Sequence, residues 1–235
     1  MKILLMEFIG YKEWTESLGY DREWKIQDIQ SSIYKVVNDE ISRVGGFALP
    51  VRYDGLIILA DGIPSGSLLE IYTKVKEISP SKVSACIGYG KTPREAEINA
   101  HNCILNSLSG EPKFDTFYDD NVVACHFDYN NFTLLTRELS FYNAYMRIMR
   151  LYSKLSEIIY DFGGITQYLG GDNMIAFIDE DTLDKIIKIV ENMDEIKVGI
   201  GIGKNARSAM AGATRALDEI RSKREDKWKI VKLSM

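Results

Sequence analysis

The sequence predicts an α+β protein built from two tandem ferredoxin-like units, each an antiparallel sheet with helices on one face. Three observations support this fold class. Apolar strands and amphipathic helices alternate along the 235 residues, and the same order of elements occurs twice. A Gly-Gly pair ends the first long helix of each half. The second glycine of each pair, Gly46 or Gly164, stands eight residues before an acidic turn residue, Asp54 or Asp172.

The first half is predicted to span residues 1–116. After its first strand, a polar connection at Lys12–Asp28 leads to a helix whose apolar positions recur every three or four residues from Ile29 to Val44. Thr92 and Pro93 are typical of a helix start and open the last helix of this half. The other predicted elements are the strands Ile3–Phe8, Phe47–Arg52, Leu56–Ala60 and Val83–Tyr89 and the helix Leu68–Ile78.

The second half, predicted as residues 117–235, repeats this order of elements. Two apolar strands within Tyr168–Phe177 are joined by a Gly-Gly-Asp-Asn turn, which is typical of a β-hairpin. Asn205 is placed to cap the last helix. The other predicted elements are the strands Val122–Phe127, Ile196–Ile202 and Trp228–Leu233 and the helices Phe141–Ile159, Leu183–Val190 and Arg207–Ile220.

Composition narrows the classes of function. A net charge of −5 argues against a nucleic-acid partner, since general nucleic-acid binders are usually basic. No apolar run reaches the roughly 18 residues of a membrane span, and the apolar N-terminus is interpreted as a strand instead of a signal peptide. The three cysteines form no CxxC pair, and with His101 and His126 they match no zinc spacing. Free buried thiols and a cytoplasmic location are therefore expected.

Two aspartates are the candidate catalytic residues. Asp172 stands at the tip of the predicted hairpin, and Asp128 follows the strand Val122–Phe127. If these strands are neighbours, the carboxylates meet at one edge of the sheet and are predicted to hold two divalent ions against a nucleotide triphosphate. The backbone carbonyl of Tyr129 is a further candidate metal ligand. The alternative is an ordinary hairpin turn, in which Gly and Asp are common.

Two loops carry candidate substrate contacts. Gly170 and Gly171 would let phosphates approach the hairpin turn because no Cβ stands in the way. A second loop joins a strand to the start of a helix, where free N–H groups and cationic side chains suit a phosphate. Its predicted contacts are Lys204, Asn205 and Arg207. A plain strand-to-helix loop with a solvated lysine is the alternative for this second loop.

Other charged residues allow weaker interpretations. His126 stands two residues before Asp128 and therefore shares its sheet face. It is either a general acid or base or a hydrogen-bonded histidine of a half-buried strand. The run Arg221–Lys227 mixes both signs of charge and is interpreted as a solvated helix end.

The two halves are expected to differ at the first strand. Both turns keep an acid, Asp54 and Asp172, but Ile9 is expected to stand in the register of Asp128. Only the second half is then predicted to keep a carboxylate pair.

These motifs resemble known proteins. A first strand ending in Asp, then a helix, then a Gly-Gly-Asp-Asn hairpin is similar to the palm fold of class III nucleotidyl cyclases, diguanylate cyclases and polymerases. Two such units, with G-G-D-N-M-I-A-F and G-I-G-I-G-K-N-A in the second, resemble the archaeal GTP cyclohydrolase III family. The likeness covers nearly the whole chain, including Tyr11 and Trp14 after the first strand and V-R-Y-D-G at Asp54.

The resemblance implies an enzyme that opens the imidazole ring of GTP. Water adds at C8, pyrophosphate leaves, and the formyl group stays in 2-amino-5-formylamino-6-ribosylamino-4(3H)-pyrimidinone 5′-phosphate, a precursor of riboflavin and deazaflavin cofactors. The family implies two Mg²⁺ ions, an activating K⁺ and a homo-oligomer, either a dimer or a tetramer. By position, Asp128 and Asp172 take the metal role, and Gly171 and Asn173 line the same turn.

One departure from the family pattern keeps other functions open. The family's first strand ends in Asp-Asn-Tyr-Gly-Pro-Trp, whereas this chain has Ile9 where that aspartate stands. A non-catalytic sensor of guanine nucleotides is one alternative. A nucleotidyl or diguanylate cyclase is another, although diguanylate cyclases carry an acid where this hairpin has Asn173.

Overall fold

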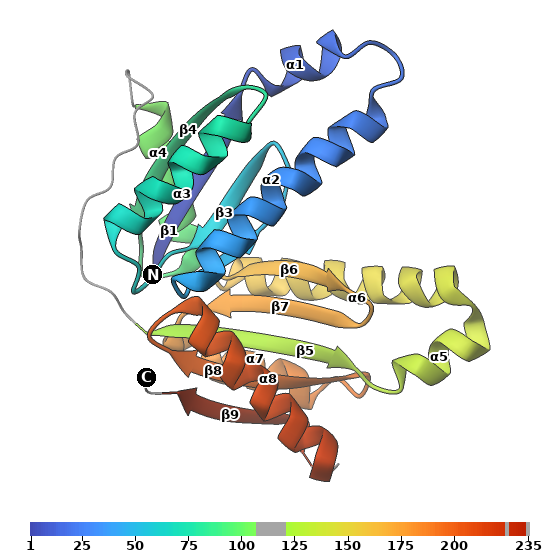
Figure 1. Cartoon of the computed structure of the whole chain (residues 1–235). Helices are drawn as coiled ribbons and strands as arrows, with labels where there is room; N and C mark the ends of the chain where they lie inside the picture. Colours follow the sequence, from blue (N-terminus) through green and yellow to red (C-terminus); the bar gives the residue numbers. More distant parts are fainter. Residues whose placement is uncertain (107–120, 224–225, 234–235) are drawn as a thin grey trace. The chain divides into compact units, whose positions relative to one another are not determined.

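The computed structural model describes residues 1–106, 121–223 and 226–233 (Figure 1). The chain divides into two compact units, one made of Met1–Lys91 and Glu95–Asp119 and the other of Thr92–Arg94 and Asp120–Met235. The predicted domain boundary between residues 116 and 117 lies outside the described residues. Each unit combines a largely antiparallel sheet with helices, so the predicted α+β fold class is confirmed.

The first unit has a sheet of order β2-β3-β1-β4 in which every neighbouring pair is antiparallel. The predicted polar connection Lys12–Asp28 is wrong, because it contains a short helix and the start of a long one. The ring of Tyr11 packs near those of Trp14 and Phe8, with centroids 5.1 Å and 6.4 Å away, and these contacts help to hold the short helix against the first strand. The elements are β1 (Lys2–Ile9), α1 (Tyr11–Ser17), α2 (Glu23–Arg43), β2 (Phe47–Leu49), β3 (Gly55–Leu59), α3 (Ser65–Ile78), β4 (Lys82–Tyr89) and α4 (Pro93–Leu105).

The second unit repeats this arrangement as β6-β7-β5-β8 and adds β9, which pairs in parallel with β8. The predicted last strand Trp228–Leu233 is therefore confirmed. Among the described residues, no helix has the length and apolar character needed to cross a membrane. The elements are β5 (Val122–Tyr129), α5 (Phe132–Leu139), α6 (Phe141–Asp161), β6 (Ile165–Gly170), β7 (Asn173–Ile178), η1 (Glu180–Thr182), α7 (Leu183–Glu191), β8 (Ile196–Gly203), α8 (Ala206–Lys223) and β9 (Trp228–Leu233).

Helices cover both faces of each sheet, whereas the sequence predicted helices on one face. In the second unit, α6 and α7 enclose the main apolar core, and α8 lies on the opposite face (Figure 1). Alternate residues of β8 are glycines, and the backbone of α8 fits closely against Gly199 and Gly201. Because these positions carry no side chains, an alanine-rich helix packs directly on the strand. In the first unit, α4 contacts Gly88 and Gly90 in the same way.

This close packing predicts a large effect of Gly201→Ala. A Cβ at Gly201 would lie 1.8 Å from the carbonyl oxygen of Ala209, so α8 must shift. Overpacking of this kind costs about 1–3 kcal/mol, and we expect the upper part of that range because the obstacle is backbone. Gly66→Ala is the matched control, since a Cβ there meets nothing within 4 Å. Urea unfolding of both variants measures the difference, and equal stabilities would contradict close α8 packing.

The cysteines differ from the sequence expectation. Cys86 of β4 and Cys103 of α4 form a disulfide, with Cα atoms 6.0 Å apart, so the prediction of three free thiols is wrong. The two residues are 17 positions apart and lie far from each other along the chain, but α4 packs on the face of β4 that carries Cys86. Cys125 alone is free among the described cysteines, and it is buried.

Thiol labelling tests this arrangement. The native protein is expected to react with no thiol reagent, because burial raises the pKa of Cys125 to about 12 and excludes the reagent. Unfolding without a reductant should expose one thiol per chain, and unfolding with a reductant should expose all three. Mass spectrometry after alkylation counts the labels. Three labels without a reductant would show that Cys86 and Cys103 are not bonded.

Candidate functional site

The hairpin between β6 and β7 places Asp172 at one edge of the second sheet. Gly170 and Gly171 have φ values of 106° and 61°, a region that glycine adopts without strain. The hydroxyl of Tyr168 donates a hydrogen bond to the carbonyl of Gly171 at 3.0 Å. These two glycines and this hydrogen bond fix the turn that presents the acid.

Strand register brings Asp128 to the same edge. Phe127 of β5 is paired with Met174 of β7, so Asp128 lies beside Asn173, the neighbour of Asp172. The pKa of Asp172 is raised, first by burial and then by the negative charge of Asp128. The structure therefore brings together the two carboxylates that the sequence predicted as a pair.

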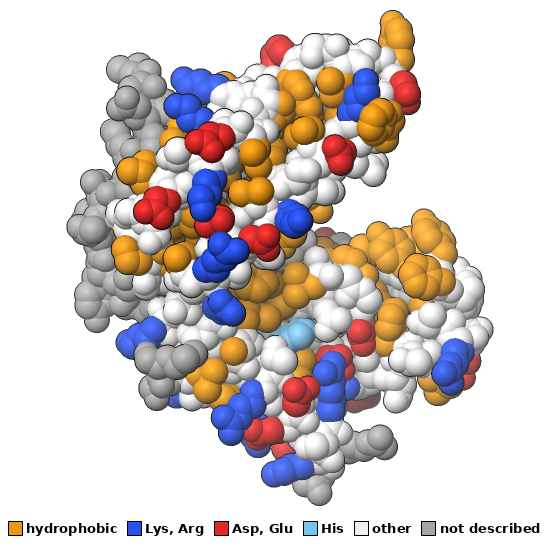
Figure 2. Space-filling model, viewed as in Figure 1, with side chains coloured by type: hydrophobic (Ala, Val, Ile, Leu, Met, Phe, Trp, Pro, Cys, Tyr) orange, Lys and Arg blue, Asp and Glu red, His pale blue; other side chains and the backbone are white. Residues whose placement is uncertain are grey.

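Two cations that the sequence analysis did not select contact Asp128. This carboxylate is only 3% exposed. Lys197, which faces Asp128 on β8, places its Nζ 2.6 Å from Oδ2, and the guanidinium of Arg221 on α8 bonds Oδ1. The interpretation of Arg221 as part of a solvated helix end is therefore wrong. Figure 2 shows acidic and basic side chains side by side on this face of the second unit, close to a histidine.

His126 holds the hairpin through Asn173. Its Nε2 lies 3.0 Å from Oδ1 of Asn173, whose amide nitrogen faces the carbonyl of Gly170 at 3.4 Å and Asp172 at 3.5 Å. Since that nitrogen is the donor to both, Oδ1 accepts the proton of Nε2. Burial lowers the pKa of His126, which favours the neutral ring. The structure thus favours a hydrogen-bonded strand histidine over a general acid or base.

Tyr129 ends β5 with its side chain in the core. The phenol is buried, and its oxygen accepts a hydrogen bond from Nε of Arg147 at 3.1 Å. The predicted use of its backbone carbonyl as a metal ligand stays a prediction.

The second predicted loop lies at the opposite end of the same strands. Val122 of β5 is paired with Gly203, whereas Asp128 is paired with Lys197. At about 3.3 Å per residue, Lys204 is therefore roughly 20 Å from the acid pair. Asn205 caps α8, as predicted, since its Oδ1 accepts the Ser208 N–H at 2.8 Å. The second unit does not bring Lys204, Asn205 and Arg207 to the acid pair, and their predicted substrate contacts stay predictions.

The first unit also keeps an acid pair, contrary to the prediction. Gly55 follows Asp54 as Asn173 follows Asp172, and Gly55 is paired with Glu7 of β1. Glu7, not Ile9, therefore occupies the register of Asp128. The error came from aligning the strands by their ends instead of by their partners. A cavity of about 370 Å³ is lined by Glu7, Asp54, Arg52 and His101 among others.

The acids of the first unit already have partners. His101 Nδ1 lies 2.8 Å from Glu7, and Arg52 lies 2.6 Å from Asp54. The second unit differs, because Asp172 has no basic side chain within ion-pair distance in the described part of the chain. The candidate site is therefore the edge that carries Asp128 and Asp172.

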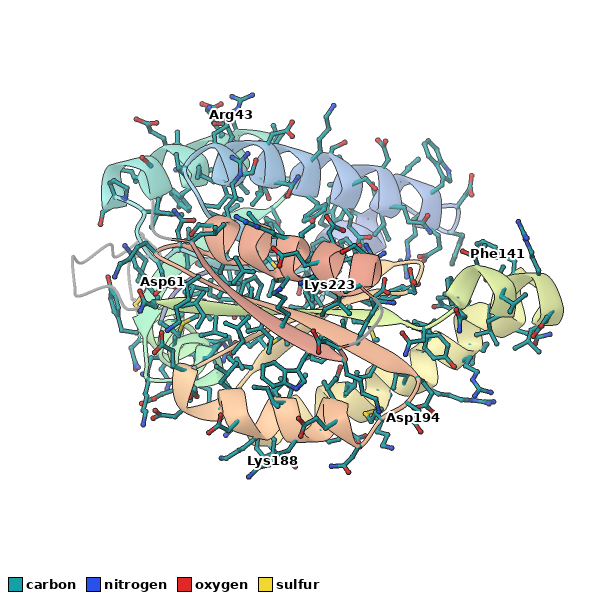
Figure 3. All side chains as sticks on the ribbon, turned by 90° about the horizontal axis from the view of Figure 1, so that it is seen from below. Arg43, Asp61, Phe141, Lys188, Asp194 and Lys223 are labelled. Atoms are coloured by element: carbon teal, nitrogen blue, oxygen red, sulfur yellow. A yellow bond between two sulfur atoms is a disulfide. The ribbon has the colours of Figure 1, made fainter. Side chains whose placement is uncertain are left out.

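A hollow of about 650 Å³ adjoins this edge beyond Lys197 and Arg221. Its other lining residues come from the loops after β5 and before β8 and from the chain before β9. Figure 3 labels Asp194, which lines the hollow, and Lys223 in the last turn of α8. Lys197 and Arg221 thus connect the buried Asp128 with a hollow whose lining is mostly polar and charged.

Comparisons with known proteins concern the whole chain. The sequence profile described as GTP cyclohydrolase III matches residues 3–233. GTP cyclohydrolase III of Saccharolobus solfataricus is 42% identical over 228 residues, which are 97% of this chain and 98% of that protein. The protein of the same name from Sulfurisphaera tokodaii is 39% identical over 231 residues, covering 98% of each chain.

Solved structures include more distant matches. A bacterial light-regulated adenylyl cyclase is 12% identical, with a TM-score of 0.39, and the match covers 98% of this chain and 85% of that chain. The family assignment depends on the sequence matches, which span nearly the whole chain at 39–42% identity. The chain belongs to the GTP cyclohydrolase III family.

Proposed function

We propose that this protein is a GTP cyclohydrolase that hydrolyses the imidazole ring of GTP at C8 and keeps the formyl group. The products are 2-amino-5-formylamino-6-ribosylamino-4(3H)-pyrimidinone 5′-phosphate and pyrophosphate. The observation that carries the proposal is the acid pair Asp128 and Asp172 at one sheet edge of a chain that matches the family over residues 3–233. A cytoplasmic homo-oligomer, either a dimer or a tetramer, belongs to the same proposal.

The acid pair fits Mg²⁺ by the chemistry of its donors. Both side chains offer hard carboxylate oxygens, and the charge of Asp128 helps to raise the pKa of Asp172, so a shared cation would relieve their repulsion. We propose that Asp128, Asp172 and the carbonyl of Tyr129 hold two Mg²⁺ ions, with K⁺ as an activating ion. Bound Mg²⁺ supplies polarisation of phosphate oxygens and a water of lowered pKa.

The residues around the acids position them. Asn173 links the turn carbonyl of Gly170 to the half-buried ring of His126, and these contacts help the hairpin to keep its shape. Lys197 and Arg221 line the hollow and are placed to contact the phosphates of a triphosphate bound there. Gly170 and Gly171 leave the turn open to the phosphates, since no Cβ covers its outer side.

Incubation with GTP, Mg²⁺ and K⁺ tests the proposed function. Loss of guanine absorbance together with release of pyrophosphate is expected. Guanine absorbance that stays constant while GTP is bound would identify a nucleotide sensor. A cyclic nucleotide with an intact guanine ring would identify a cyclase. Size-exclusion chromatography with light scattering gives the oligomeric state, and a monomer would contradict the proposed assembly.

The acid side of the pH profile should report Asp172. Metal binding needs this carboxylate ionised, and its pKa in the folded protein is raised above the ordinary 3.8. Affinity for Mn²⁺, a paramagnetic substitute for Mg²⁺, should therefore fall with decreasing pH before an isolated aspartate would protonate. Titrations by electron paramagnetic resonance at several pH values measure this. In Asp172→Asn the midpoint should move to lower pH, and an unchanged midpoint would assign it to another group.

The disulfide bears on the proposed location. Disulfides are rare in cytosolic proteins, but the intracellular proteins of hyperthermophilic archaea are an exception. The Cys86–Cys103 bond therefore agrees with a cytoplasmic location in an organism of that kind.

A further inference from the structure

Each oxygen of the Asp128 carboxylate already has a cationic partner that competes with a metal ion. Oδ2 is bonded by Lys197 at 2.6 Å, and Oδ1 is bonded by Arg221. Asp128 is buried, so its charge interacts strongly with these two cations. A divalent ion alone would have to compete with these two cations for the carboxylate and would lie close to their positive charges.

A triphosphate changes this balance. The hollow lined by Lys197 and Arg221 lies beside Asp128, and phosphate oxygens in it would offer both cations a new anionic partner. Two acids line the hollow, Asp194 and Asp226. Asp194 is already paired with Lys227, whose Nζ lies 2.6 Å from Oδ1. The phosphates would release Asp128 at the moment when a metal ion arrives with them.

The side chains of the two cations differ in how firmly they are held. The side chain of Lys197 is 18% exposed and also donates to Oδ1 of Asn130 at 3.2 Å, so it is held in place. The side chain of Arg221 is 45% exposed and has an exposed second partner, Asp218, at 3.4 Å. Arg221 can therefore turn away from Asp128 more easily than Lys197.

We propose that Lys197 and Arg221 form a latch on Asp128 that weakens the binding of a divalent ion until a polyphosphate takes over the two cations. This inference rests on the proposed function for the identity of the nucleotide, but the latch itself concerns binding and not turnover. It makes metal and triphosphate binding cooperative, because each ligand removes the obstacle to the other. Arg221 is the moving part of the latch.

The latch predicts effects of opposite sign in one variant. In Arg221→Gln, Mn²⁺ added without nucleotide should bind about tenfold more tightly, because Asp128 has lost a competing cation. The affinity for a fluorescent GTP analogue measured in EDTA should fall about tenfold, because a phosphate ligand is gone. Lys197→Gln should change both affinities in the same directions. Arg215→Gln is the control, since the exposed Arg215 lies on α8 but pairs with Glu219 instead of Asp128, and neither affinity should change.

Other results overturn the latch. Damage to the fold would weaken both affinities, and independent sites would leave Mn²⁺ binding unchanged in Arg221→Gln. Arg221→Lys keeps a charge and should lie between the wild type and Arg221→Gln in Mn²⁺ affinity, which keeps the test valid if Lys197→Gln does not fold. GTP turnover by the wild type is measured separately. Turnover without the opposite-sign pattern refutes only the latch, and the pattern without turnover refutes only the proposed reaction.

Discussion

Asp172→Asn is expected to lower GTP turnover by about 10³-fold or more without loss of stability. Removing one of two metal-binding carboxylates takes away several kcal/mol of transition-state stabilisation, and about 4 kcal/mol corresponds to that factor. The fold should tolerate the change, because the pKa of Asp172 is raised in the folded protein. A raised carboxyl pKa means that folding disfavours the charged form, so a neutral asparagine is at least as stable near pH 7.

Steady-state kinetics and thermal unfolding of Asp172→Asn measure both effects. Asp161→Asn is the control, since Asp161 ends α6 on the exposed surface of the same unit. Its turnover should equal that of the wild type. Turnover within tenfold of the wild type in Asp172→Asn would remove this residue from the active site. A large drop in melting temperature would instead show that its charge stabilises the hairpin.

Asp128→Asn is expected to lose turnover to a similar extent and also to lose stability. An asparagine leaves Lys197 and Arg221 without their carboxylate, and the charge of Lys197 is mostly buried. Breaking such a pair typically costs about 3–5 kcal/mol when it is fully buried, and the exposure of Arg221 reduces our expectation to about 1–3 kcal/mol. The two variants are therefore expected to differ in stability although both lose activity.

Urea unfolding of Asp128→Asn measures this cost. The double variant Asp128→Asn with Arg221→Gln should recover part of it, because it removes one of the two cations that lose the Asp128 carboxylate. A single variant as stable as the wild type would mean that water satisfies both cations. That outcome would contradict the strong interaction on which the latch depends.

The local pattern was enough to predict the hairpin and its acids. Gly170 and Gly171 before Asp172 specify a turn within four residues, and alternation of apolar residues identifies the strands that flank it. The meeting of Asp128 with Asp172 followed from one further assumption, that β5 and β7 are neighbours. Short-range signals of this kind are read directly from sequence.

Contacts that depend on register were missed. Lys197 meets Asp128 because β5 and β8 pair in one register. Arg221 reaches Asp128 because α8 packs on the glycine face of β8. Glu7 was overlooked for the same reason, since its equivalence to Asp128 appears only through its partner Gly55. The Cys86–Cys103 bond likewise needs the packing of α4 on β4.

The most direct test of the proposed reaction follows the carbon that it attacks. Purified protein is incubated with GTP labelled with ¹³C at C8, Mg²⁺ and K⁺, and the carbon signal is followed by nuclear magnetic resonance. We predict that the imidazole signal is replaced by a formamide signal in a ribosylaminopyrimidine, and that no free formate forms. Asp172→Asn should leave the imidazole signal in place. Release of labelled formate, or an unchanged imidazole signal with the wild type, would contradict a ring opening that keeps the formyl group.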